Sequence, residues 1–276
     1  MVELGIVDIR EIIRLINSIY GFDFSNYSLT SFKYRLENVI AKNNLNSPES
    51  LFRKLSDQPE FFDKFLHQIS VPSSEMFRDP SVWRWLREVY FPSLDEKHLL
   101  NFKIWLPYCV SGGELYTLAI VLNEINLLDK VKIYATSFSD ESIELIKSGE
   151  YPYKKIEISS ENYRRFQGEN EFTNYYKEEK YRVRREIELI KDVEFIKDDI
   201  NFGNAPKNIK LILLRNVMIY FNPSFQERFI ENLHGYLSGF GNLIIGLKEK
   251  IRISQNAPHL FEEEEANEGV FKKRLV

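Results

Sequence analysis

Strand-like and helix-like segments alternate along the chain from about residue 95 onward, and this alternation restricts the possible folds more than any other feature. Short apolar runs are followed by stretches whose apolar residues recur every three or four positions. The strand-like runs are KIWLPYCV, VKIYATSF, VEFIKDD, IKLILLRNV and GNLIIGL, and the helical stretches include GELYTLAIVLNEI, DESIELIKSG and PSFQERFIENLHGYL. This order predicts an α/β fold with βαβ units around a mostly parallel sheet. The last run, GVFKKRLV, is expected to add a terminal antiparallel strand.

The part of the chain before this alternation has helical periodicity instead. Its helical segments are DIREIIRLINSIY, LTSFKYRLENVIAK, PESLFRKLSDQ and PEFFDKFLHQIS, with Ser, Asn or Pro near their ends. We therefore expect two domains. Residues 1–90 form a helical domain with its linker, and residues 91–276 form the α/β domain.

A long, charged, tyrosine-rich insert separates DESIELIKSG from VEFIKDD. It is too long for a simple loop, so residues from about 160 to 192 are expected to form a subdomain of their own. Lys180, Arg182 and Arg184 alternate there with Tyr181 and Val183, which on a strand gives one basic face and one apolar face. A basic face suits an acidic peptide, and a solvated strand edge protected by charge explains the pattern at least as well.

Composition excludes several kinds of site and partner. The single cysteine, Cys109, can form neither an internal disulfide nor a cysteine-based zinc site, and the histidines (His67, His98, His234 and His259) are too far apart for a local metal site. The net charge of −4 argues against nucleic-acid binding. No apolar run approaches the roughly 20 residues that span a bilayer, and the N-terminus lacks a basic start, so we expect a cytoplasmic protein without membrane insertion. The acidic run FEEEEANEG from Phe261 predicts an exposed loop.

A turn with paired glycines joins the first strand-like run to the helix after it. Gly112 and Gly113 tolerate positive φ and have no Cβ, so a ligand can approach the backbone and the helix start closely. An ordinary tight turn explains the glycines about as well. Because ligands bind at the carboxyl ends of parallel strands, we expect a pocket rim of residues 109–114, 136–140, 198–200 and 215–216. No GxGxxG motif and no Walker lysine accompany this rim.

Several longer motifs together resemble the CheR-type chemotaxis receptor methyltransferases. They are SSEMFRDPSVWRWL, IWLPYCVSGGELYTLAI, IYATSFSDESIELIKSGEYP, LLRNVMIYFNPSFQERF and GNLIIGLKE, and RNVMIYF is highly specific to that family. The resemblance covers nearly the whole chain. It implies a Rossmann-like methyltransferase sheet with a small inserted β-subdomain, preceded by an all-helical N-terminal domain. It also implies S-adenosylmethionine as cofactor and glutamate side chains on the cytoplasmic helices of chemoreceptors as methyl acceptors.

The same resemblance implies roles for individual residues. Arg78 and Tyr220 are the implied catalytic residues, with Tyr220 near the transferred methyl group. The implied cofactor-binding residues are Ser74, Arg78, Glu114, Ser137, Asp199, Ile200, Arg215 and Asn216. The insert is similar to the small β-subdomain that docks on the receptor in this family.

The cofactor motifs also depart from the family pattern. Ser137 stands where the family has an aspartate, Gly113 replaces the first acid of a GEE sequence, and Leu115 replaces its following proline. Pro72 replaces an asparagine, and GLKE stands for GHSE. A carboxylate can accept hydrogen bonds from both ribose hydroxyls, whereas a serine offers one small neutral group. We therefore expect weak cofactor binding.

The chemistry implied here asks for few catalytic groups. A glutamate is ionised at neutral pH, so methyl transfer from a sulfonium to its carboxylate needs no general base, and alignment with desolvation does most of the work. Protein-glutamate methylation is the leading hypothesis. A methyltransferase fold that has lost cofactor binding and serves as a receptor-binding or scaffold module is the alternative, and a small-molecule methyltransferase is a third.

Overall fold

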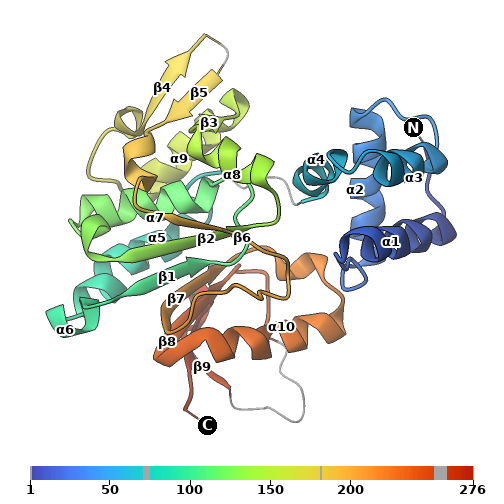
Figure 1. Cartoon of the computed structure of the whole chain (residues 1–276). Coiled ribbons are helices and arrows are strands. Elements are labelled where there is room, and N and C mark those ends of the chain that lie inside the picture. The colour runs from blue at the N-terminus through green and yellow to red at the C-terminus, as the bar shows by residue number, and fades with distance from the viewer. Residues whose placement is uncertain (1, 71–74, 181, 252–259, 276) are drawn as a thin grey trace.

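The computed structural model describes residues 2–70, 75–180, 182–251 and 260–275. Figure 1 shows a group of helices on one side, a central twisted sheet between helices, and a smaller sheet beyond one edge of it. The prediction of an all-helical N-terminal domain followed by a Rossmann-like sheet with a small inserted sheet is confirmed.

The N-terminal helices follow the predicted helical segments. They are α1 (Ile6–Tyr20), α2 (Leu29–Lys42), α3 (Pro48–Asp57) and α4 (Phe61–Ile69). Each buries one apolar stripe, as helical periodicity requires. Gly21 ends α1 with a φ of 68°, and the Ser47 side chain accepts a hydrogen bond from the Ser50 backbone N–H at the start of α3.

Within the described residues, seven strands form the main sheet in the order β6-β2-β1-β7-β8-β10-β9. The first five are mutually parallel: β6 (Glu194–Lys197), β2 (Lys132–Ser137), β1 (Lys103–Leu106), β7 (Ile209–Leu214) and β8 (Leu237–Ile245). The predicted terminal antiparallel strand is confirmed as β10 (Val270–Lys273), which pairs with β8. The carboxyl ends of the parallel strands therefore lie along one edge of the sheet.

The prediction of an exposed loop from Phe261 onward is wrong. Residues Phe261–Glu265 form strand β9, antiparallel to β10 at the edge of the sheet. The Phe261 side chain is buried, and Glu262 and Glu264 lie near the cations Arg274 and Lys272. Acidic residues at a sheet edge are common because charge prevents further strand pairing. The run of glutamates therefore marks an edge strand here.

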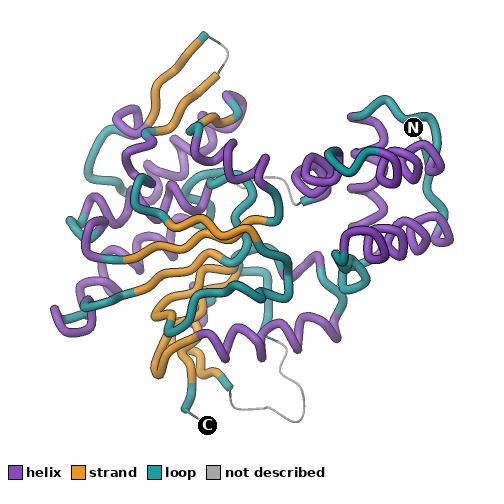
Figure 2. Tube along the Cα trace, viewed as in Figure 1, coloured by secondary structure: helices purple, strands orange, loops and turns teal. Residues whose placement is uncertain are grey.

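Helices cover both faces of the sheet (Figure 2), and the side chains along a strand alternate between two cores. In β1, Trp105 packs in the core shared with α10 (Pro223–Tyr236) and the N-terminal helices, whereas Ile104 and Leu106 pack in the core shared with α7 (Gly113–Glu124). The other helical segments of this domain are α5 (Pro80–Trp85), its π-helical continuation Leu86–Tyr90, α6 (Glu96–Leu99), α8 (Asp140–Lys147) and α9 (Ile156–Phe166). The α5 segment packs in the α7 core, so residues just before position 90 already contact the α/β domain.

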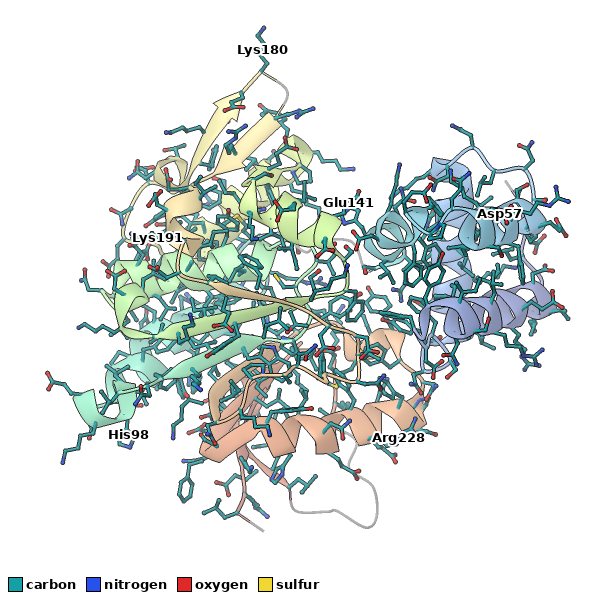
Figure 3. All side chains as sticks on the ribbon, viewed as in Figure 1. Asp57, His98, Glu141, Lys180, Lys191 and Arg228 are labelled. Carbon is teal, nitrogen blue, oxygen red and sulfur yellow. The ribbon has the colours of Figure 1, made fainter. Side chains whose placement is uncertain are left out.

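A small sheet of order β3-β5-β4 is built from β3 (Glu150–Tyr151), β5 (Arg182–Arg185) and β4 (Tyr176–Glu179). Its first strand lies before residue 160, where we expected the insert to begin. In β5 the side chains of Arg182 and Arg184 are exposed and that of Val183 is buried, as the alternation predicted. Lys180 points away from the body of the protein (Figure 3). The domain boundary at residues 90 and 91 stays a prediction.

Polar contacts join the helical domain to the sheet domain beside α8. Asp63 of α4 accepts hydrogen bonds from the backbone N–H groups of Asp140 and Glu141 at the start of α8 (3.0 and 2.9 Å). His67 Nδ1 lies 2.8 Å from Ser142 Oγ. A carboxylate at a helix N-terminus is favourable, because it meets unpaired N–H groups. In the described part of the chain, no helix is both long and apolar enough to cross a membrane.

Candidate active site

The glycine turn, which we define as residues 109–113, lies between the carboxyl end of β1 and α7. Gly112 has a φ of 74°, and a Cβ there would lie 2.9 Å from Ile146 Cγ2. Glycine is therefore required both for the backbone conformation and for space. The Cys109 backbone N–H donates to the Thr136 carbonyl over 2.8 Å, which fixes the turn against the end of β2.

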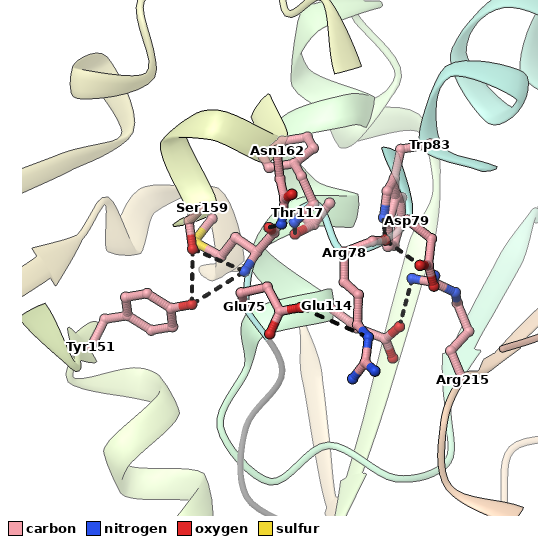
Figure 4. A network of polar contacts seen from close by, with 12 residues as sticks. Glu75, Arg78, Asp79, Trp83, Glu114, Thr117, Tyr151, Ser159, Asn162 and Arg215 are labelled. Carbon is pink, nitrogen blue, oxygen red and sulfur yellow. Dashed lines mark hydrogen bonds and ion pairs between the residues drawn. The ribbon is translucent and has the colours of Figure 1, made fainter. Parts of the chain in front are cut away.

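A second segment, residues 75–79, crosses the same edge, and we call it the arginine segment because it carries Arg78 (Figure 4). Phe77 and Asp79 have φ values of 54° and 51°, so Arg78 stands between two residues in the left-handed region. Such residues cost about 1–3 kcal/mol each and persist only where their surroundings hold them. Phe77 is held by a 2.9 Å hydrogen bond from its N–H to Thr117 Oγ1 and by complete burial of its ring.

Arg215, just after β7, holds the far end of the arginine segment. Its guanidinium bonds Asp79 Oδ2 at 2.7 Å, Glu114 Oε1 at 3.0 Å and the Arg78 carbonyl oxygen at 3.1 Å (Figure 4). The side chain is 1% exposed and lies over the ring of Trp83. A buried cation bonded to two carboxylates fixes the relative positions of three chain segments.

A cavity opens between these segments at the carboxyl ends of β1 and β7. Its walls are Arg78, Leu106, Tyr108, the glycine turn with Glu114, and Arg215, Asn216, Val217 and Tyr220. The structure thus brings five of the predicted site residues together: Arg78, Glu114, Arg215, Asn216 and Tyr220. Among the described residues, no group of histidine, cysteine and acidic side chains is arranged to hold a metal ion.

Three of the other predicted site residues, Ser137, Asp199 and Ile200, do not line the cavity. The Ser137 side chain, at the end of β2, is buried, and its hydroxyl has no hydrogen-bond partner within the described ranges. Asp199 accepts from the Asn201 backbone N–H in a tight turn, and Ile200 is buried in the core with the N-terminal helices. Ser74 lies outside the described residues.

The two predicted catalytic residues both line the cavity. The side chain of Arg78 is 40% exposed and lines the cavity, so its guanidinium is accessible to a ligand. Its Nε lies 3.8 Å from Glu75 Oε1. Tyr220 lies under the guanidinium of Arg35, which is 4.7 Å from the ring centroid. Its backbone oxygen accepts from the Ser28 N–H, so the helical domain helps to place it.

Glu249, which the sequence interpretation did not include, fixes a residue of the cavity wall without lining the cavity itself. It follows β8 and accepts hydrogen bonds from the N–H groups of Asn216 and Gly246, both at 2.8 Å, which fixes Asn216 at a φ of 58°. Burial raises the pKa of Glu249 above its ordinary value, against the lowering effect of these N–H groups. The sequence signal that could have identified Glu249 is its position just after a parallel strand, in GLKE.

Burial also changes the acidity of two groups in the cavity wall. It raises the pKa of Glu114, although the Arg215 guanidinium opposes this change. It raises the pKa of the Cys109 thiol to about 12, so the thiol is protonated and is a poor nucleophile. The wall therefore contains an acid held by an arginine and no activated nucleophile among these groups.

The residues present fit part of what S-adenosylmethionine requires. The glycine turn admits a close ligand, and the Arg215 Nε–H is buried without an acceptor in the described part of the chain. Glu114 and Asn216 supply polar groups in the same wall. The fit is poorest at Ser137, whose hydroxyl is small and buried.

Comparisons with known proteins agree with this arrangement. The family model described as CheR methyltransferase, SAM binding domain, matches residues 72–270, and the one described as CheR methyltransferase, all-alpha domain, matches residues 7–70. A Pseudomonas putida protein named as the methyltransferase Cher3 is 31% identical over 248 residues, or 90% of each chain. Chemotaxis protein methyltransferases of Listeria monocytogenes and Borreliella burgdorferi are 26% and 27% identical, over 86% and 92% of this chain and 88% and 91% of theirs.

Proposed function

The chain belongs to the CheR methyltransferase family, and from this premise we propose that it transfers a methyl group from S-adenosylmethionine to glutamate side chains of chemoreceptors in the cytoplasm. The cytoplasmic helices of a receptor are the proposed protein substrate. The observation that carries the proposal is the cavity at the carboxyl ends of β1 and β7, which both Arg78 and Tyr220 line.

In this proposal, Glu114, Asn216 and the backbone of the glycine turn hold the cofactor. The cofactor supplies a methyl group on a positively charged sulfur. The Arg215 guanidinium lies 3.0 Å from Glu114 and favours its ionised carboxylate. The carboxylate can therefore accept a hydrogen bond from a cationic amino group. Gly112 leaves the cavity wall open where a side chain would fill it.

The acceptor glutamate needs orientation more than activation. Its carboxylate is ionised near neutral pH, so no residue has to remove a proton. The accessible guanidinium of Arg78 can bind that carboxylate, and the left-handed residues on either side of Arg78 limit its backbone movement. Tyr220 presents a hydroxyl-bearing ring in the same wall, supported by Arg35. Alignment of the two reacting groups in the cavity is the proposed source of the rate enhancement.

A second candidate function is favoured by one observation. The Ser137 hydroxyl is buried and unpaired within the described residues, at a position where a carboxylate would serve the ribose. A protein of this fold without useful cofactor affinity would act as a receptor-binding or scaffold module. The two candidates differ in a measurable property, which is methyl ester formation.

The direct experiment combines the protein, S-adenosylmethionine with an isotopically labelled methyl group, and a receptor cytoplasmic fragment. We expect label on glutamate side chains, located by mass spectrometry and removed by mild base. A fragment with those glutamates replaced by glutamine is the matched control. Receptor binding without label, together with no calorimetric signal for S-adenosylhomocysteine, would favour the scaffold function.

A further inference from the structure

Arg185, the last residue of β5, is a buried arginine that lies between the small sheet and the glycine turn. Its side chain is among the largest fully buried ones, and the whole residue is 1% exposed. Among the described residues it makes no ion pair with a carboxylate. Its hydrogen-bond acceptors are three backbone carbonyl oxygens: Nη1 donates to Ser111 at 3.0 Å, Nη2 to Glu150 at 3.1 Å and Nε to Gly149 at 3.3 Å.

The surroundings of Arg185 restrict its position closely. Its guanidinium carbon lies 4.0 Å from the ring centroid of Tyr116 in α7 and 4.9 Å from that of Tyr151 in β3. Its backbone passes so near Gly149 that a Cβ on that glycine would lie 2.7 Å from the Arg185 carbonyl oxygen. Burial of a charge with only carbonyl and aromatic partners is unfavourable, and it lowers the pKa of Arg185 to about 10. Such an arrangement calls for an explanation beyond packing.

The contact with Ser111 acts on the cavity wall from behind. The Ser111 carbonyl and the Gly112 N–H belong to one planar trans peptide group, so they point in opposite directions. Holding the carbonyl toward Arg185 therefore directs the Gly112 N–H to the opposite side, away from Arg185. Both Cys109 and Gly112 line the cavity.

We propose that Arg185 is a positioning residue for the glycine turn, through which the small sheet sets the shape of the cofactor-binding wall. The inference rests on the proposed function for the identity of the ligand. The link between β5 and the glycine turn is independent of that function, because it is the hydrogen bond from Arg185 to the Ser111 carbonyl oxygen.

The test compares variants of the full chain. R185M removes every donor of the side chain while keeping much of its volume, and R185K keeps the charge and one donor group. R184M removes an exposed arginine from the same strand. R87M removes a buried arginine that also donates to a carbonyl, that of Gln167 at 2.7 Å, and covers an aromatic ring, but does not contact the turn. R87M thus controls for general loosening around the insert.

Two measurements are made on each folded variant: amide hydrogen exchange of the peptide that contains residues 109–114, and titration with S-adenosylhomocysteine. In R185M we expect exchange at the turn to be about tenfold faster and affinity about tenfold weaker, with R185K intermediate. R184M and R87M should leave both unchanged, even if R87M melts at a lower temperature. In turnover, R185M should raise the KM for S-adenosylmethionine about tenfold while kcat falls less than about threefold.

Unchanged exchange and affinity in folded R185M would overturn the proposal, as would equal losses in R87M. If R185M does not fold, R185K decides: exchange at the turn equal to that of the natural protein would overturn the proposal. If the natural protein binds no S-adenosylhomocysteine, the proposed function fails, and the exchange measurement still decides the role of Arg185.

Discussion

Arg215 donates a hydrogen bond from Nη2 to Asp79 Oδ2 over 2.7 Å and thereby joins the end of β7 to the arginine segment. The same nitrogen lies 3.1 Å from the Arg78 carbonyl oxygen. Arg215 therefore fixes the backbone that carries the Arg78 side chain, although it is 136 positions away from Asp79 in the sequence. Arg215, which the resemblance suggested as a cofactor ligand, already has most of its donors bound within the protein.

The first prediction concerns the stability of this network. R215M leaves Asp79 and Glu114 without their buried cation, so we expect the free energy of unfolding to fall by about 3 kcal/mol, as is typical when one partner of a buried ion pair is removed. Urea denaturation measures the change. R165M is the matched control, because Arg165 and Glu161 form an exposed pair at the same 2.7 Å distance, and we expect a loss below about 1 kcal/mol. Similar losses in both variants would mean that the buried network is no more important than a surface pair.

The second prediction concerns catalysis. R78A removes the accessible guanidinium from the cavity, so methyl transfer should fall by at least about a hundredfold because the acceptor carboxylate loses its orientation. Circular dichroism should show an unchanged fold, since the structural contacts of Arg78 use its backbone carbonyl. R84A is the control, as Arg84 lies on nearby α5 and not in the cavity wall. Full activity in R78A would remove Arg78 from the site.

The fold could be predicted largely from the sequence because its signals are local. The period of apolar residues changes from the helical domain to the strands, and Gly112 marks a turn that needs positive φ. The strand β9 could not be predicted this way. Its glutamates have low strand propensity, and its stabilising contacts come from Phe261 burial and pairing with β10, which depend on the finished sheet.

The site could be predicted only in part, for a related reason. Motifs identified residues in the wall such as Arg78 and Glu114, and they did not show how these residues are held. Asp79 meets Arg215 only after the chain folds. Arg185 could not be identified for a different reason. Alternation along β5 assigns it to the buried face with Val183, where an arginine is not expected.

The third prediction concerns pH and the contact between the two domains. Burial lowers the pKa of His67 below its ordinary 6.5, although Glu141 and Asp63 act to raise it and Lys42 to lower it. Below about pH 6.5 the unfolded state therefore binds more protons than the native state, and stability falls as the pH is lowered. H67N keeps a nitrogen donor near Ser142 and removes the titration. Relative to H67N, the natural protein should lose stability between pH 8 and pH 5, by at most about 1.4 kcal/mol per pH unit.

S142A is the companion variant in that experiment. It removes the hydroxyl that His67 contacts but leaves the imidazole half-buried as before, so its pH dependence should remain like that of the natural protein. Chemical denaturation at a series of pH values measures all three proteins. Parallel curves for the natural protein and H67N would show that His67 does not titrate differently in the folded state.

The last prediction concerns Ser137, because it separates an enzyme from a scaffold. A carboxylate that accepts hydrogen bonds from a ribose diol contributes roughly 1.5–3 kcal/mol, which is one to two decades of affinity. The Ser137 hydroxyl is neutral, buried and unpaired in the described structure, and the carboxylate of Asp140 is bound to Lys197 and so is a poor substitute. We expect the natural protein to bind S-adenosylhomocysteine weakly, and S137D to bind at least about tenfold more tightly. S137N is the control for size, since it has a similar volume without the charge, and we expect a gain below about threefold. Calorimetric titration of the three proteins in one buffer measures these differences. Tight binding by the natural protein, with no gain in S137D, would mean that another group holds the ribose and that Ser137 is compatible with catalysis.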